Sequence, residues 1–525
     1  MHLPLPILAL SLSLYHTTLA TPLLSIRGND SPKPINTTTC NTQTYTYTSL
    51  AGFGKLPSDI RDKYGDTIGV GSAIAIDKSS VRCRKTKKNN KNKSVYEGII
   101  YGLPDRGWNT QGTQNTQARI HKFGFTFDSS VVGTKEEPAQ PNFKLRYEDT
   151  ILLTGPDGKA LTGLDPTGSV EVKGFGVLPV ATYTGDGFGG PGAGGSLVPI
   201  DAEGLVLGLD GTFWISDEYA AAIYQFSAAG KMLQAIHPPA AFTPRRNGSV
   251  SFSAASPPIY DQQFKIVPEQ PTSGRGNNQG LEALTRSPDG KFLYTMLQSA
   301  TVQDGGTSSS KRRNTRFLTY SVKKNKDLKL IAEYAVQLPV LPTGRVASQS
   351  EMHYISPTQF LVLSRDSNAG HGLANSTSIY RNADVIDISS ATNILGTAAD
   401  AVGGQIASKD GVLNAGITPA TYCPWLSYNN NDELGKFGLH NGGEQDSGLL
   451  NEKWESFALI KVDEEEKRGS AGDEYFLVSF SDNDFITQNG FINSGKIPYK
   501  DASGYDLDTQ VLVFRITLPK GADPL

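Results

Sequence analysis

Sulfur-containing residues are scarce in this chain. It has only three cysteines, Cys40, Cys83 and Cys423, and four methionines among 525 residues. So few and such widely spaced cysteines exclude a disulfide-built scaffold and a cysteine-rich zinc cluster. They allow at most one disulfide, and the sequence leaves its pairing open.

Long apolar runs are almost absent too. Residues 1–20 form an apolar run without Asp, Glu, Lys or Arg, and it ends in Thr18-Leu19-Ala20. The run is too short for a membrane span, and its small final residues suit signal peptidase. We therefore predict a signal peptide over 1–20, cleavage close to Thr21, an N-terminal extension over 21–43 and a secreted, extracellular protein with no membrane partner.

The chain has little net charge. Its 49 basic and 52 acidic residues give −3 at neutral pH, which provides no general attraction to nucleic acid or anionic membranes. The one dense basic run, Arg82–Lys93, contains no aromatic residue, and Asp463–Arg468 is an acidic run near the other end. We interpret both as solvated loops inserted into hairpins.

Familiar catalytic motifs are missing. The sequence has no G-x-S-x-G, no H-E-x-x-H and no C-x-x-C, and its seven histidines are not clustered. A serine–histidine triad assembled from distant positions stays open, but no motif indicates one. Carboxylates are the chemistry that the sequence does offer.

A hairpin pattern recurs along the chain. Asn277–Gln298 reads NNQGLEALTRSPDGKFLYTMLQ, in which two short strands flank a Ser-Pro-Asp-Gly turn and Glu282 interrupts the apolar first strand. The 55 glycines and 30 prolines fit such a turn-rich β protein. Similar hairpins cover Asp201–Glu218, Glu351–Asp366, Trp454–Asp482 and, more faintly, Gly71–Asp105.

A further strand follows each hairpin. These strands are Ala118–Phe123, Ala222–Ser227, Arg316–Val322, Asp384–Ile388 and Val511–Ile516. Repeated antiparallel units with unequal spacing predict an all-β fold, a β-propeller with five detectable blade units (five or six blades) over 44–520. We expect Thr44–Leu50 to pair beside Val511–Ile516 and close the ring, because that edge would otherwise be unpaired.

The repeats also place acids at matching positions. First strands of propeller blades line the central channel, so their glutamates should converge there, where each close pair repels by about 4 kcal/mol at an effective dielectric near 20. Calcium suits such a set of hard oxygen ligands. We expect Glu203, Glu282, Glu351, Asp366, Glu455 and Asp482 to bind the metal, Glu282, Glu203, Asp217 and Glu218 to be catalytic, and Arg106 and Arg365 to bind substrate phosphate. The alternative is that these acids only bond to main-chain amides and water.

Four Asn-x-Ser/Thr sequons are compatible with passage through the secretory pathway. They predict glycosylation at Asn36, Asn92, Asn247 and Asn375.

Several stretches resemble a known family. DAEGLVL with WISDEYAAAIYQF, NNQGLEALTRSPDGKFLY, FLVLSRD, and WESFALI with FLVSFSDNDF are similar to the phytase-like family, also described as the esterase-like domain of phytase. The resemblance covers about Gly69 to Leu518. It implies a propeller-like fold and hydrolysis of phosphate esters, inositol phosphates among them.

These observations lead to one function and two alternatives. We expect a secreted, monomeric hydrolase that attacks a small-molecule phosphate ester with a calcium-activated water and does not bind nucleic acid. The first alternative is a calcium-dependent lactonase or esterase-type propeller. The second is a non-catalytic propeller that binds a ligand.

Overall fold

The computed structural model describes Met1 and residues 33–88, 91–323, 328–468 and 472–525. The chain divides into two parts, Met1–Lys33 and Pro34–Leu525, and all the described helices and strands lie in the second. The predicted signal peptide, its cleavage site and most of the extension lie outside the described residues. Among the residues described, no helix is long and apolar enough to cross a membrane.

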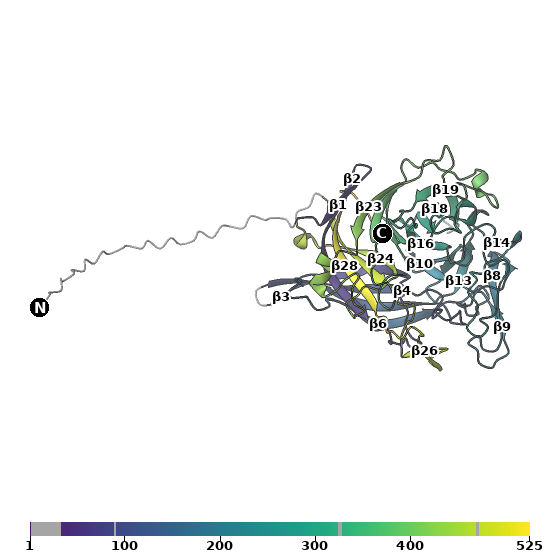
Figure 1. The fold of residues 1–525 in the computed structure, drawn as a ribbon, viewed down its shortest axis with the longest axis horizontal. Helices are drawn as coiled ribbons and strands as arrows, with labels where there is room; N and C mark the ends of the chain where they lie inside the picture. Colours follow the sequence, from purple (N-terminus) through teal and green to yellow (C-terminus); the bar gives the residue numbers. More distant parts are fainter. Residues whose placement is uncertain (2–32, 89–90, 324–327, 469–471) are drawn as a thin grey trace. The chain divides into compact units, whose positions relative to one another are not determined.

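The second part is nearly all-β and is built from five large antiparallel sheets (Figure 1). In four of them, four strands pair in the order in which they occur in the sequence. These strands are β3 (Ala73–Lys88), β4 (Lys91–Leu103), β5 (Arg119–Asp128) and β6 (Phe143–Leu152); β10 (Ala202–Leu207), β11 (Phe213–Asp217), β12 (Ile223–Phe226) and β13 (Met232–Ile236); β16 (Leu281–Arg286), β17 (Phe292–Leu297), β18 (Asn314–Val322) and β19 (Leu328–Gln337); and β20 (Ser348–Tyr354), β21 (Gln359–Arg365), β22 (Arg381–Asp387) and β23 (Thr421–Ser427).

The fifth sheet joins the two ends of the chain. Its strands lie in the order β1 (Asn36–Cys40), β2 (Gln43–Leu56), β28 (Thr509–Leu518), β25 (Asp473–Ser481) and β24 (Trp454–Lys461). In the antiparallel pair of β2 and β28, Leu50 lies opposite Phe514. The predicted pairing of Thr44–Leu50 with Val511–Ile516 is therefore confirmed, and β1 adds a strand within the predicted extension.

Short elements connect these sheets. They are β7 (Gly168–Val172), β8 (Gly176–Tyr183), β9 (Gly195–Leu197), β14 (Arg245–Arg246), β15 (Ser249–Val250), β26 (Gly490–Ile492), β27 (Ile497–Tyr499), the single-turn helix α1 (Asn431–Leu434) and the 3-10 turns η1 (Val302–Asp304), η2 (Ala398–Asp400), η3 (Gly435–Phe437) and η4 (Glu464–Glu466).

The strands that open the five hairpins, which we call the first strands, contact one another in a closed order. β3 contacts β10, β10 contacts β16, β16 contacts β20, β20 contacts β24, and β24 contacts β3. Apolar side chains fill the space between neighbouring sheets. Phe127 of β5 lies 4.9 Å from Phe476 of β25, and Tyr294 of β17 lies 4.8 Å from Phe360 of β21, both measured between ring centroids. This packing holds the acid-bearing first strands side by side.

The interpretation of Arg82–Lys93 as a loop is wrong. Most of this run belongs to β3 and β4, which continue as a paired ribbon with Arg84 opposite Val95. The ribbon meets the acidic run of the last hairpin, where Lys85 Nζ lies 2.7 Å from an oxygen of Asp463 and 2.6 Å from one of Glu465. The two charged insertions compensate each other, which a reading of each run alone could not reveal.

One disulfide links the edges of two sheets. Cys40 at the end of β1 is bonded to Cys423 in β23, while Cys83 is a free, half-buried thiol. The bond thus ties the outer strand of the fifth sheet to the outer strand of the fourth.

Candidate active site

Bulges near the start of the first strands position the acidic side chains. Relative to the neighbouring strand, β16 contains Glu282 as an extra residue and β24 contains Glu455. In β10, Glu203 and Gly204 together lie opposite a single residue of β11. These three glutamates therefore occupy equivalent, bulged positions in three sheets. A bulge re-aims the side chain that it carries.

In the fourth sheet this position belongs to Ser350, and Glu351 follows it. The carboxylate of Glu351 accepts a hydrogen bond of 2.7 Å from the N–H of Met352. Glu351 lines a cavity of about 400 Å³ together with Met352, His353 and Leu525. The structure therefore brings Glu203, Glu282 and Glu455 together and places Glu351 elsewhere.

Asp201, Glu203 and Glu218 form what we call the inner group. One carboxylate oxygen from each lies within 4.8 Å of the others, and the three residues are 1%, 7% and 1% exposed. Burial, followed by the nearby charge of Glu282, raises the pKa of Glu203 well above its usual value. Burial and Asp201 raise the pKa of Glu218 to about 8, although Arg106, Arg275 and the Gly280 N–H act in the opposite direction.

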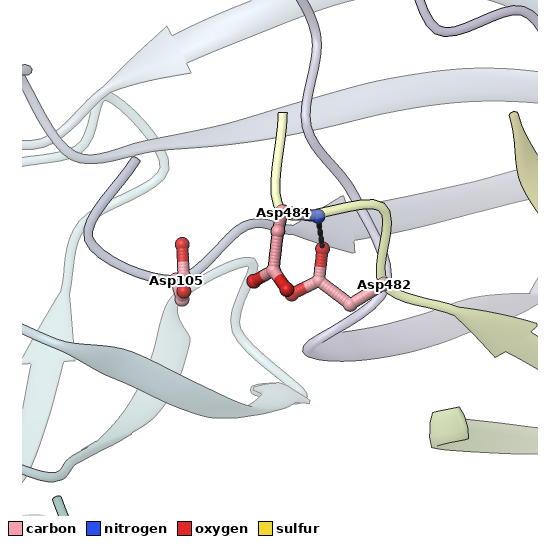
Figure 2. Close-up of side chains that lie close together, drawn as sticks. All are labelled: Asp105, Asp482 and Asp484. Carbon is pink, nitrogen blue, oxygen red and sulfur yellow. Dashed lines mark hydrogen bonds between the residues drawn. The ribbon is translucent and has the colours of Figure 1, made fainter. Parts of the chain in front are cut away.

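Asp105, Asp482 and Asp484 form a second cluster, the cleft group (Figure 2). Asp482 and Asp484 lie on the turn that follows β25, and Asp105 faces them from the segment after β4. The N–H of Asp484 donates a hydrogen bond of 2.9 Å to Asp482. Segments from opposite ends of the chain thus build this cluster.

Lys453 supplies the positive charge of the cleft group. Its Nζ atom lies 2.5 Å from a carboxylate oxygen of Asp484, 3.6 Å from one of Asp482 and 3.9 Å from one of Asp105. Although burial acts to lower it, the surrounding carboxylates hold the pKa of Lys453 well above its usual value. Burial raises the pKa of Asp105 even though Lys453 opposes it. Lys453 therefore stays charged, while Asp105 binds its proton unusually tightly.

Both arginines expected to bind phosphate are engaged with acids. Arg106 Nη1 lies 2.9 Å from Asp201, and Arg365 forms an ion pair with Glu455. Arg365 also donates a hydrogen bond of 3.2 Å to the Ser350 hydroxyl. Each arginine side chain is only 11% exposed. Both arginines lie beside the acids as expected, but the N–H groups named here already contact Asp201, Glu455 and Ser350 rather than facing an open site.

Asp217 and Asp366 organise turns. Asp217 accepts hydrogen bonds from the N–H groups of Asp201 and Ala220 and from the hydroxyl of Tyr224. Asp366 accepts bonds from Ser378 and Ile379 at 2.6 and 2.8 Å. Neither belongs to the inner group or the cleft group.

A cleft of about 340 Å³ opens over Lys453, Asp482 and Asp484. Its wall also contains Glu452, His371 and Asp501. Burial lowers the pKa of His371, so its imidazole is neutral near pH 7. Burial acts to raise the pKa of Asp501, but hydrogen bonds from Thr110, Trp108 and Ser503 lower it overall. The volume suits a small molecule.

Three acidic residues and a lysine of these groups were not predicted as site residues: Asp105, Asp201, Asp484 and Lys453. Asp484 follows Asp482 by two residues in SDND, a spacing that could have indicated a shared site. Asp201 opens the second hairpin and Asp105 closes the first, so the repeat pattern did contain both. Lys453 directly precedes the last hairpin and gave no signal of its own.

Two of the sequons lie in exposed connecting segments. Asn247 lies at the tip of the β14–β15 hairpin and Asn375 precedes β22, and both are exposed. Asn36 in β1 is also exposed, but its side-chain amide donates a hydrogen bond to the carbonyl of Trp425. Asn92 lies in β4 opposite Lys87.

Comparisons with known proteins find relatives over most of the chain. A family model for phytase-like proteins, described as "esterase-like activity of phytase", matches residues 96–468. An uncharacterized secreted protein of Arthroderma benhamiae is 49% identical over 491 residues, which span 91% of this chain and 94% of that protein.

Solved structures resemble this chain only distantly. A luciferin-regenerating enzyme aligns with 89% of this chain and 98% of its own at 10% identity, with a TM-score of 0.26. Virginiamycin B lyase from Staphylococcus aureus aligns with 59% of this chain and 95% of its own at 11% identity, with a TM-score of 0.16. These likenesses are too weak to carry an argument about fold or function.

Proposed function

The chain belongs to the phytase-like family, and on that premise we propose that it is a secreted hydrolase of ester bonds that acts on a small-molecule phosphate ester, with inositol phosphates as the first candidates. The observation that carries the proposal is the cleft over Asp482, Asp484 and Lys453, where carboxylates and an ammonium group meet in a space of about 340 Å³. The secreted relative from Arthroderma benhamiae supports export.

The cleft group offers acid–base chemistry. Burial raises the pKa of Asp484, which favours proton uptake by this carboxylate nearer to neutral pH. Asp482 accepts hydrogen bonds from Ser72 and from the N–H of Asp484, which hold its carboxylate in place. In this proposal, Asp484 takes the proton from the attacking water, and Lys453 stabilises the negative charge that develops on the ester.

Charge in the cleft makes a metal ion necessary for a phosphate substrate. Glu452, Asp482, Asp484 and Asp501 line it, and Lys453 is the basic residue of this wall. A phosphate group would be repelled there without a further cation. A divalent cation that enters the cleft together with the phosphate substrate would offset that charge and polarise the ester. We propose calcium, because the acids present are hard oxygen donors.

A second candidate function follows from the same negative wall. An uncharged carboxylic ester or lactone would enter the cleft without electrostatic repulsion, which favours the lactonase or esterase alternative. The carboxylate of Asp484 would activate water in the same way.

One set of assays separates these activities. Protein from culture medium is tested for phosphate release from phytate and p-nitrophenyl phosphate, and for acid release from p-nitrophenyl acetate and a γ-lactone, with calcium or with chelator. We expect calcium-dependent phosphate release that falls at least tenfold in Asp484→Asn. The matched control is Asp410→Asn, which changes an exposed aspartate paired with Lys311. Acid release without phosphate release would favour the second candidate, and neither activity would favour a ligand-binding protein.

We also propose that the five large sheets are the blades of a β-propeller. The closed order of contacts among β3, β10, β16, β20 and β24 supports this architecture, as does the pairing of β2 with β28. A crystal structure would test the blade number, and light scattering would test the proposed monomeric state.

A further inference from the structure

We infer that the inner group, Asp201, Glu203 and Glu218, is a binding site for one hard divalent cation, calcium in the first instance. The inference deepens the proposed function, on which any catalytic use of the ion rests, whereas binding of the ion does not depend on it. Asp201 and Glu218 are absent from the metal ligands that the sequence predicts.

The strongest evidence is the unpartnered carboxylate of Glu218. This residue is 1% exposed, and neither of its oxygens makes a hydrogen bond of good geometry to any described residue. The Gly280 N–H lies close enough to lower the pKa of Glu218 but does not meet the distance and angle of a hydrogen bond. One oxygen lies within 4.8 Å of carboxylate oxygens of Asp201 and Glu203. A buried carboxylate without a partner is costly. A cation between these three oxygens would supply the missing partner.

The charge balance around Glu218 points to a divalent ion. Glu282, which adjoins Glu203, brings the carboxylates to four, and the guanidinium groups that act on them are those of Arg106 and Arg275. When a bound ion keeps these acids ionised, four carboxylates against two guanidinium groups leave two negative charges. Asp165 and Asp217, which also act on Arg275, add to this excess. Glu455 does not change this balance, because Arg365 pairs with it.

Neither arginine makes a hydrogen bond to Glu218. Arg106 contacts Asp201 with its N–H and Nη1 at 3.2 and 2.9 Å. Arg275 is fully buried and donates its hydrogen bonds to the main-chain carbonyls of Phe252, Ser253, Tyr219 and Gly276. Arg275 therefore lowers the local negative charge without bonding to Glu218.

The cleft group differs from the inner group in this respect. There Lys453 Nζ already lies 2.5 to 3.9 Å from all three aspartates. In the protein without substrate, an ion in that cluster would have to displace the ammonium group or be repelled by it. The inner group has three carboxylates and neither histidine nor cysteine, a set that suits calcium, magnesium or manganese rather than zinc.

The test measures binding of the metal alone. Full-length protein is stripped with chelator, and calcium binding is followed by isothermal titration calorimetry and by the shift of the melting temperature. We expect one equivalent of calcium, a melting temperature that rises with calcium concentration, and an affinity reduced at least tenfold in both Glu218→Gln and Glu203→Gln. The matched control is Glu351→Gln, a buried first-strand glutamate outside the group, which should bind calcium as the unchanged protein does.

Other results would overturn the inference. These are no calcium uptake at millimolar concentration, undiminished affinity in folded Glu218→Gln and Glu203→Gln, or loss of binding in Asp484→Asn while both inner-group variants still bind. Circular dichroism confirms folding, and if one glutamine variant fails to fold, the other decides. Calcium binding without ester hydrolysis would support the site and contradict the proposed function, so the two failures can be told apart.

Discussion

Cys40 and Cys423, which are 383 positions apart in the chain, form a disulfide with a Cα–Cα distance of 5.8 Å. The bond closes most of the chain into a loop and connects β1 to β23. A crosslink of this kind stabilises mainly by restricting the unfolded chain, typically by about 2–5 kcal/mol. We expect Cys423→Ser to lower the free energy of unfolding by that order, measured by denaturant titration. Cys83→Ser, which removes the free thiol, is the control, and equal stability of both variants would contradict the prediction.

Lys453 should be more important for stability than an ordinary surface lysine. Replacing it by methionine leaves the buried Asp482 and the half-buried Asp484 without their cation. Loss of one partner of a buried pair costs about 3–5 kcal/mol. Urea titration at pH 7 measures the effect. Lys461→Met is the control, because Lys461 is 55% exposed and lies 3.8 Å from Asp473. A loss in Lys453→Met as small as in this control would show that the cleft group does not need the ammonium group.

The raised pKa of Asp384 predicts a pH dependence of the free energy of unfolding. Burial raises its pKa to about 6, while Tyr380, Tyr422 and the N–H of Trp425 donate hydrogen bonds that limit the rise. The pKa of Asp384 is thus about 6 in the folded protein and about 4 in the unfolded chain. Its contribution to folding is fully present below about pH 4 and is lost as the pH rises through about 6. Relative to Asp384→Asn, the unchanged protein should lose on the order of 2 kcal/mol between pH 4 and 7. Parallel stability curves for the two proteins would contradict this prediction.

Glu282 should affect activity more than stability. Burial, followed by the charges of Glu218 and Glu455, raises its pKa well above the usual value, and Gln298 donates a hydrogen bond to it. Glutamine resembles the protonated acid, so Glu282→Gln should keep or raise the melting temperature without metal. Ester hydrolysis and calcium affinity should each fall at least tenfold. Unchanged hydrolysis and affinity, equal to those of Glu351→Gln, would remove Glu282 from the site.

Export makes two measurable predictions. Amino-terminal sequencing of protein from culture medium should give a start close to Thr21.

Asn247→Gln should reduce the mass by one glycan without changing the melting temperature, because Asn247 lies on an exposed hairpin tip. Intact Met1 on protein without glycans would contradict both.

Local sequence was sufficient to predict most of the strands. The predicted strands Arg316–Val322 and Val511–Ile516 correspond to β18 and β28, with ends that differ by a few residues. Apolar residues flanked by turn residues specify a strand wherever the sheet lies. The closing pair of β2 and β28 was also predictable, because Thr44–Leu50 had no other partner and an edge had to be filled.

The side-chain groups depended on the tertiary structure. Sequence alone determined that acids recur at the starts of first strands, and Glu203, Glu282 and Glu455 do meet. It could not assign Glu351, because a bulge at Ser350 decides which of two neighbouring residues faces the others. It could not pair Cys40 with Cys423, or Asp105 and Lys453 with Asp482 and Asp484, because these contacts join segments from distant parts of the chain. Hydrogen bonds and turn preferences act over a few residues, whereas register and packing between sheets are settled only when all the sheets assemble.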